Sequence, residues 1–160
     1  MTADEVSVLS RRIAEAPSLI HLAPAITRPD DGLKQVVSAL ASDPRPGVVF
    51  VADEEDRLLG WISEDTLDSD VLVAVLPGDR WLTSGEMDTP EIKRAARSLQ
   101  QTAREMMDPA GTATPDITLR DAITSMSNSR HRVLALVDDQ QRLLGYVTLF
   151  DILAAVLREL

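Results

Sequence analysis

The chain has 160 residues, of which 44% are hydrophobic and 26% charged, and its formal net charge is −10 at pH 7. This composition is typical of a globular protein and allows one domain or two small ones that share a core. The chain has no cysteine, which excludes disulfides, thiol catalysis and thiolate metal sites, and its acidic balance argues against a general nucleic-acid binder, which needs Lys and Arg to neutralise phosphates.

Two further classes of protein are disfavoured. The two histidines, His21 and His131, stand in no zinc-binding pattern, so we expect no metal centre. The longest apolar run, residues 71–76, is far too short to span a bilayer, and the acidic N-terminus leads into no secretory signal. We therefore expect a cytoplasmic protein that binds neither a membrane nor nucleic acid.

The N-terminal part of the chain predicts two helices separated by short extended pieces. Apolar residues at helical spacing indicate a helix over residues 2–16, which Pro17 ends. A second helix is expected over residues 33–40, with Asp30 or Asp31 as its cap.

Two strands follow, and then a region with mixed signals. Residues 48–51 form a continuous apolar strand that should be buried on both faces, and residues 57–62 form the next strand after an acidic turn. The run 71–76 fits a helix or a strand on periodicity alone. A helix is expected over residues 89–107, since a threonine cap is followed by proline at the first helical position.

The sequence contains a tandem duplication with an offset of 85 or 86 residues. The tetrapeptide Arg-Leu-Leu-Gly occurs at 57–60 and again at 142–145, and Pro-Asp pairs at 29–30 and 115–116 precede the same apolar spacing. Each half is therefore predicted to run strand, helix, strand, strand, helix, because an internal repeat decides the architecture before any local signal does.

The junction at residues 143–151 carries the strongest chemical signal. A short strand, with Gly145 where a close backbone approach would occur, breaks straight into a helix. The free N–H groups of that helix start suit an anion, Thr148 offers a hydroxyl, and Asp151 offers two acceptors to a sugar diol. The alternative is that Thr148 and Asp151 only cap the helix, which stabilises it by about 1 kcal/mol and needs no ligand.

Four motifs support a family resemblance: Met107-Asp108-Pro109, Pro115-Asp116-x-x-Leu119, Ala135-Leu136-Val137-Asp138 and Arg142-Leu143-Leu144-Gly145-Tyr146-Val147-Thr148-x-x-Asp151. With these motifs the second half resembles a cystathionine-β-synthase-type (CBS) domain. The first half resembles one less closely. The chain from about residue 19 to residue 157 resembles a tandem CBS pair, or Bateman module, that stands alone without a catalytic or DNA-binding domain.

The resemblance implies an α+β fold of two β-α-β-β-α repeats related by a pseudo-two-fold axis and preceded by an N-terminal helix. The chain then divides into four parts. They are the N-terminal helix (1–18), the first CBS repeat (19–76), a connection with a linking helix (77–104) and the second CBS repeat (105–160).

The resemblance also implies a non-catalytic regulatory module, not an enzyme. Such modules bind an adenosyl ligand such as AMP, ADP or ATP between the repeats, require no cofactor, take Mg²⁺ as an optional companion, and pair into homodimers through their helices. Ligand binding would change the packing of the two repeats, and an unknown protein partner would respond to that change. Thr148 matches the position that meets phosphate and Asp151 the position that meets ribose. The positions that match the base pocket are Thr112, Ala113, Arg132, Val133 and Leu134.

The first repeat departs from this pattern. Ser63 keeps the hydroxyl, but Thr66 stands at the ribose-carboxylate position, and Glu64 and Asp65 would repel a phosphate. We therefore expect at most one competent site, which is built mainly from the second repeat.

Several alternatives remain open at this stage. Arg28 and Arg45 could offset the acidic residues of the first repeat, and the basic cluster 130–132 could face phosphate or lie in a solvated loop. The acidic runs 53–56 and 138–139 could collect Mg²⁺ or form solvated turns. The whole chain could accordingly be a ligand-free dimeric scaffold or a divalent-cation sensor.

Overall fold

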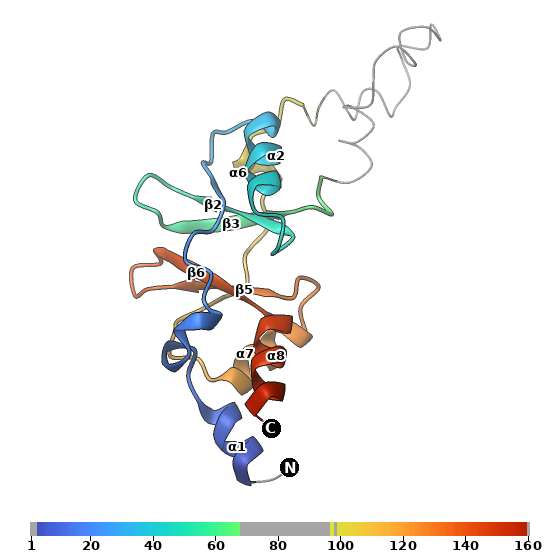
Figure 1. Cartoon of the computed structure of the whole chain (residues 1–160). Helices are drawn as coiled ribbons and strands as arrows, with labels where there is room; N and C mark the ends of the chain where they lie inside the picture. Colours follow the sequence, from blue (N-terminus) through green and yellow to red (C-terminus); the bar gives the residue numbers. More distant parts are fainter. Residues whose placement is uncertain (1–2, 68–96, 98, 160) are drawn as a thin grey trace, which may run out of the picture.

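Two three-stranded mixed sheets stack at the centre of the molecule, with helices on the outer face of each (Figure 1). The computed structural model describes residues 3–67, 97 and 99–159. In each sheet the first two strands are parallel and the last two antiparallel. The fold is α+β, as predicted. The strands are β1 (Ile26–Thr27), β2 (Val48–Ala52) and β3 (Leu58–Ser63) in the first sheet, and β4 (Thr112–Ala113), β5 (Val133–Val137) and β6 (Leu143–Thr148) in the second.

The helices form the two outer layers of the molecule. α2 (Leu33–Ser42) and the short α6 (Ala103–Met106) cover the first sheet. α7 (Leu119–Ser127) and α8 (Leu149–Glu159) cover the second sheet. The N-terminal helix α1 (Ala3–Ser10) packs against α7 and α8, so the beginning of the chain lies on the second repeat. None of the helices in the described part of the chain has the length and apolar character needed to cross a membrane.

The central strands β2 and β5 are buried along their whole length, as the continuous apolar runs predict. Side chains alternate between the two faces of a strand. In β2, Val49 and Val51 therefore face the helices, whereas Val48 and Phe50 face the other sheet. The core between the two sheets consists of Val48, Phe50, Trp61, Val133, Ala135 and Tyr146.

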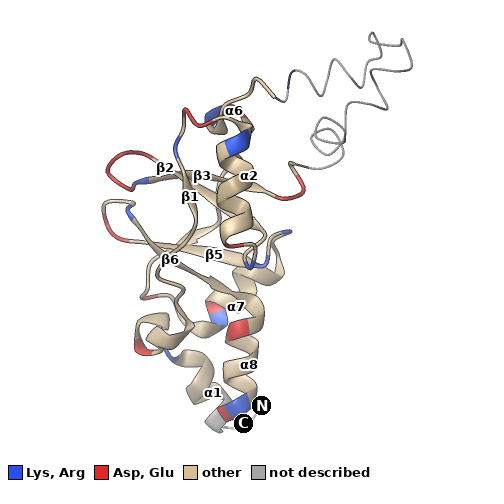
Figure 2. Ribbon diagram, turned by 45° about the horizontal axis from the view of Figure 1, so that its top comes forward, with Lys and Arg blue, Asp and Glu red and all other residues tan. Residues whose placement is uncertain are grey.

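The two β-hairpins have the same geometry, which confirms the duplication. Asp56 and Gln141 occupy equivalent turn positions and have positive φ angles of 61° and 63°. The turns also bond to each other, because Leu58 N donates to Gln141 O at 2.9 Å and Leu143 N donates to Asp56 O at 2.9 Å. Figure 2 shows the two turns side by side, both with acidic residues.

Each sheet is extended by the segment that enters the opposite repeat. His21, at the start of the first repeat, pairs with Tyr146 of β6, and Asp108, at the start of the second, pairs with Trp61 of β3. This crossing explains Gly145, because a Cβ there would clash with the carbonyl oxygen of His21. The predicted close backbone approach at this glycine is therefore confirmed.

The first predicted helix is shorter than expected. α1 ends at Ser10, and the chain continues as two 3₁₀ turns, η1 (Ile13–Glu15) and η2 (Pro17–Leu19), instead of one helix to residue 16. The reason is tertiary: Ile13 N donates to Ile117 O at 3.0 Å and Ala14 N to Pro115 O at 2.8 Å. These N–H groups serve the second repeat and cannot continue the helix.

Two other expectations about helices need correction. The N-cap of α2 is Gly32 and not an aspartate, since the Asp31 carboxylate accepts from Thr27 Oγ1 at 2.9 Å and Arg28 N at 2.8 Å. The helix expected over residues 89–107 is interrupted by a turn at 99–100 before α6. The rest of that helix up to residue 96, and the run 71–76, lie outside the described residues.

Candidate functional site

Thr148 and Asp151 lie together at the start of α8, directly after β6. Thr148 Oγ1 accepts a hydrogen bond from Asp151 N at 3.2 Å and donates one to Asp151 Oδ2 at 2.7 Å. The helix-capping interaction considered in the sequence is therefore present. The carboxylate is half-exposed, so capping leaves it accessible to a ligand.

One side chain of the other half of the molecule, His21, contacts this carboxylate, and a second, Arg45, contacts His21. His21 Nε2 lies 2.8 Å from Asp151 Oδ2, and Arg45 Nη1 lies 3.1 Å from His21 Nδ1. The His21 ring is stacked on Tyr146, with 4.7 Å between the ring centroids and 20° between the planes. Sequence reasoning missed His21; the signal available was its place in the duplication, at the position that Asp108 of the family entry motif occupies before the second repeat.

The loop that carries Arg45 is anchored to β6. Tyr146 Oη donates a hydrogen bond to Asp43 Oδ2 at 2.7 Å. Burial, and secondly this bond to a carboxylate, raise the pKa of Tyr146 well above its usual range. The phenol therefore stays a neutral donor, and it holds the loop of the first repeat against the second sheet.

Asp151 is ionised at neutral pH. The hydrogen bond with His21 is the largest influence and lowers the pKa of Asp151; burial opposes it, and Thr148 and the charge of Arg45 lower it further. The site thus offers carboxylate acceptors, a cationic guanidinium and the positive end of the α8 helix dipole. These groups suit a ligand that combines hydroxyls with an anionic group.

The residues 132–134 adjoin Thr148 through the backbone only. Arg132 O accepts from Leu149 N at 3.0 Å, and Val133 is the antiparallel partner of Thr148. The side chain of Val133 is buried between the two sheets and that of Leu134 in the core of the second repeat. A ligand could reach this segment only at its peptide groups and at the exposed Arg132 side chain.

Thr112 and Ala113 lie on β4, across β5 from the junction. They pair with Ala135 and Leu136 of β5, so a whole strand separates them from β6. Within the described residues, no hydrogen bond or ion pair joins either of them to Thr148 or Asp151. The structure therefore does not bring these two predicted residues to the carboxylate.

The equivalent junction of the first repeat faces the second repeat. Ser63 Oγ is buried and lies 3.1 Å from the hydroxyl of Thr66. Arg130 Nε lies 3.3 Å from Asp65 Oδ2, and the His131 ring meets Trp61 edge-on at 5.5 Å. Both junctions thus face the loop before the central strand of the opposite repeat, and each candidate site is built from two repeats.

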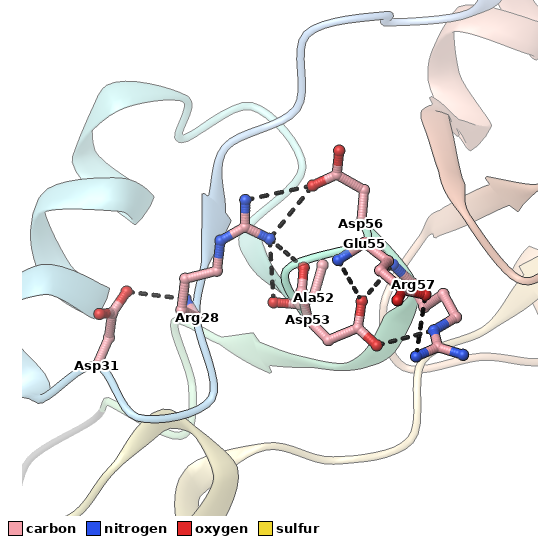
Figure 3. A network of polar contacts seen from close by, with 7 residues as sticks. All are labelled: Arg28, Asp31, Ala52, Asp53, Glu55, Asp56 and Arg57. Carbon is pink, nitrogen blue, oxygen red and sulfur yellow. Dashed lines mark hydrogen bonds and ion pairs between the residues drawn. The ribbon is translucent and has the colours of Figure 1, made fainter.

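Arg28 does not compensate Glu64 and Asp65 of the first repeat. Its guanidinium donates to the carbonyl oxygens of Ala52 and Asp53 and lies 3.2 Å from Asp56 Oδ1, which ties it to the turn between β2 and β3 (Figure 3). In the described part of the chain, no group of three or more His, Cys, Asp or Glu side chains is arranged to hold a metal ion. The carboxylates of the acidic turn at 53–56 instead pair with Arg28 and Arg57.

A pocket of about 490 Å³ adjoins the same carboxylate, between the η1–η2 segment and α8. His21 and Asp151 line it together with apolar side chains such as Leu19 and Val156. A bidentate ion pair between Arg11 and Glu159, with both distances at 2.8 Å, joins two of its lining residues. The pocket is an open space beside Asp151.

The duplicated sheets, the crossed entry segments and the paired strand-to-helix junctions define the fold of a tandem CBS pair. The comparisons agree: residues 103–158 match the family model described as "CBS domain", so the second repeat is a CBS domain. No curated protein sequence is significantly similar to this chain.

Solved structures of CBS-domain proteins match nearly the whole chain. A protein from Bacillus anthracis is 14% identical with a TM-score of 0.70, and the match covers 98% of this chain and 99% of that one. A protein from Thermotoga maritima is 21% identical with a TM-score of 0.65, covering 93% and 96%. CBSX2, solved in complex with AMP, is 17% identical with a TM-score of 0.62, covering 92% and 96%. At these identities the likeness establishes the fold.

Proposed function

We propose that the chain is a non-catalytic regulatory module that binds an adenosyl ligand, such as AMP, ADP or ATP, where the two repeats meet at Asp151. The observation that carries the proposal is that Asp151 and Thr148 of the second repeat are linked through His21 to Arg45 of the first, whose charge acts on the carboxylate. The carboxylate would accept the ribose hydroxyls, and Arg45 with the start of α8 would face the phosphate. CBSX2, which has the same fold, was solved with AMP.

A ligand in this position would link the two halves of the molecule. Asp151 belongs to the second repeat, whereas His21 and Arg45 belong to the first half of the chain. A ligand that contacts both would favour one relative packing of the repeats over another, and a partner protein would read that shift.

Thermal unfolding of the purified protein with AMP, ADP, ATP or S-adenosylmethionine, each with and without Mg²⁺, tests the proposal. A ligand at about 100 times its Kd adds roughly 2.7 kcal/mol to the free energy of unfolding, which shifts Tm by several degrees. We expect one nucleotide to raise Tm and Asp151→Ala to abolish the shift. Asp139→Ala is the matched control, because it removes an exposed carboxylate on the β5–β6 turn and should keep the shift.

Two other results would replace the proposal. A rise of Tm with Mg²⁺ alone would make the chain a divalent-cation sensor. No rise with any ligand would leave Thr148 and Asp151 as a helix cap and favour the ligand-free scaffold. A shift that Asp151→Ala retains would place the nucleotide elsewhere.

We further propose that the chain forms a homodimer through α8. Phe150 and Leu157 are 67% and 69% exposed, and Ala154 lies between them on the same side of the helix. An uncharged apolar stripe on an outer helix marks an interaction surface, and two such stripes can cover each other across a two-fold axis.

Light scattering on a size-exclusion column tests the dimer. We expect the wild-type protein to show twice the chain mass of 17.5 kDa, and Leu157→Glu to show a single chain. Leu144→Glu is the control, because Leu144 is an exposed apolar residue on β6 outside the stripe. A monomeric wild type, or dissociation by both variants, would contradict an interface on α8.

A further inference from the structure

The backbone of His21 is fixed independently of its imidazole. His21 N donates to Tyr146 O at 2.9 Å, and Tyr146 N donates to His21 O at 3.1 Å. The segment therefore stays paired with β6 when the ring is removed. What the ring adds is its stacking on Tyr146 and its contacts with Arg45 and Asp151.

The contact with Arg45 decides which nitrogen of His21 carries the hydrogen. A guanidinium has donors only, so the Nδ1 atom, 3.1 Å from Arg45 Nη1, must be the acceptor. The hydrogen of the imidazole is then on Nε2, which donates to Asp151 Oδ2 at 2.8 Å. A chain of donors thus runs from Arg45 through His21 to the carboxylate.

This series of hydrogen bonds leaves one oxygen of the Asp151 carboxylate without a donor. Oδ2 accepts from both His21 and Thr148, at 2.8 and 2.7 Å, and a carboxylate oxygen has two lone pairs. In the part of the chain that the structure describes, no hydrogen bond or ion pair falls on Oδ1. A ribose presents two neighbouring hydroxyls, which can bind the two oxygens of one carboxylate. Only Oδ1 of Asp151 is available to them.

We propose that His21 is a gate residue of the Asp151 site. The inference rests on the proposed nucleotide function and specifies how that site is regulated. With the imidazole in place, Asp151 binds one hydroxyl of the ligand and Arg45 is engaged by Nδ1. When the ring swings away, Oδ2 and the guanidinium are released in one step, and the site gains its ribose acceptor and its phosphate donor together.

Calorimetric titration with AMP and 2′-deoxy-AMP tests the gate. In the wild-type protein we expect AMP to bind only slightly more tightly than 2′-deoxy-AMP, because neighbouring hydroxyls form two well-aligned hydrogen bonds only when both oxygens of the carboxylate are available. In His21→Ala we expect AMP to bind about tenfold more tightly than in wild type and 2′-deoxy-AMP to gain less, because Oδ2 then accepts only from Thr148 and can also accept from the second hydroxyl. His131→Ala is the matched control, since the ring of His131 lies on Trp61 and not on Asp151. It should leave both affinities unchanged.

A measurement without ligand supports the same test. The hydrogen bond with His21 is the main cause that lowers the pKa of Asp151. An NMR titration of the Asp151 carboxyl carbon should therefore show a higher pKa in His21→Ala than in wild type, and no change in His131→Ala. An unchanged pKa in His21→Ala would show that the imidazole does not occupy the carboxylate and would overturn the gate.

The two ways of failing are distinguishable. If AMP binds the wild type but His21→Ala binds it equally or more weakly, the gate is wrong and the proposed function stands, with His21 as a contact of the ligand or a bystander. If AMP binds neither protein, the proposed function fails and the gate fails with it, because opening the site should have revealed binding.

Discussion

Replacing Gly145 with alanine is expected to destabilise the protein and to separate His21 from Asp151. A Cβ at this position would clash with the carbonyl oxygen of His21 and would lie 3.0 Å from the Cγ2 atom of Ile20. The His21 carbonyl belongs to the backbone, which two hydrogen bonds hold to Tyr146. It therefore cannot move away by a change of rotamer, as a side chain could. Overpacking of this kind costs about 1–3 kcal/mol. Chemical denaturation measures the loss, and the NMR signal of the Asp151 carboxyl reports the broken contact.

Gly111→Ala is the matched control. A Cβ at Gly111 would meet Trp61 at 3.5 Å, which is an ordinary van der Waals contact, and its backbone needs no positive φ. The free energy of unfolding should therefore stay within about 1 kcal/mol of wild type. If Gly145→Ala were as stable as Gly111→Ala, the crossed pairing of His21 with β6 would be wrong.

The same argument applies to Gly60, its counterpart in the first repeat. A Cβ there would lie 2.6 Å from the carbonyl oxygen of Asp108, which belongs to the segment that enters the second repeat. The repeated Arg-Leu-Leu-Gly sequence thus has a common physical cause. Each glycine makes room for the entry segment of the opposite repeat and so joins the two halves of the pair.

The sequence predicted those parts of the site that depend on neighbouring residues. The strand-to-helix junction, the capping by Thr148 and the close approach at Gly145 follow from local chemistry, and the structure contains all three. The duplication likewise predicted two equivalent sheets with equivalent hairpins. Sequence patterns predicted these features because each one depends on residues that are close together in the chain.

The partners of Asp151 could not be found in this way. The family resemblance directed attention to Thr112 and to residues 132–134 of the same repeat, whereas in the structure His21 of the other half contacts the carboxylate and Arg45 contacts His21. The crossing of the entry segments decides this arrangement, and nothing in the spacing of polar residues records it. The sequence could not decide the roles of Arg28 and Arg45, because both depend on tertiary structure. Arg28 binds the β2–β3 turn, whereas Arg45 contacts His21 at the candidate site.

The N-terminal segment was misread for a related reason. Its apolar residues at helical spacing predict a helix to residue 16. In the structure Ile13 is completely buried in the core of the second repeat, together with Leu19 and side chains of α7 and α8. The segment is thus a part of that core.

Ile13→Ala is therefore expected to destabilise the second repeat strongly. Removing a fully buried Ile side chain costs about 2–5 kcal/mol, and Tm falls by about 2–4 °C for each kcal/mol in a chain of this size. Val6→Ala is the control, because Val6 on α1 is 40% exposed and its truncation should cost no more than about 1 kcal/mol. Equal Tm values for the two variants would show that the segment is not part of the core. A selective loss in Ile13→Ala would show that the segment before the first repeat contributes to the core of the second repeat.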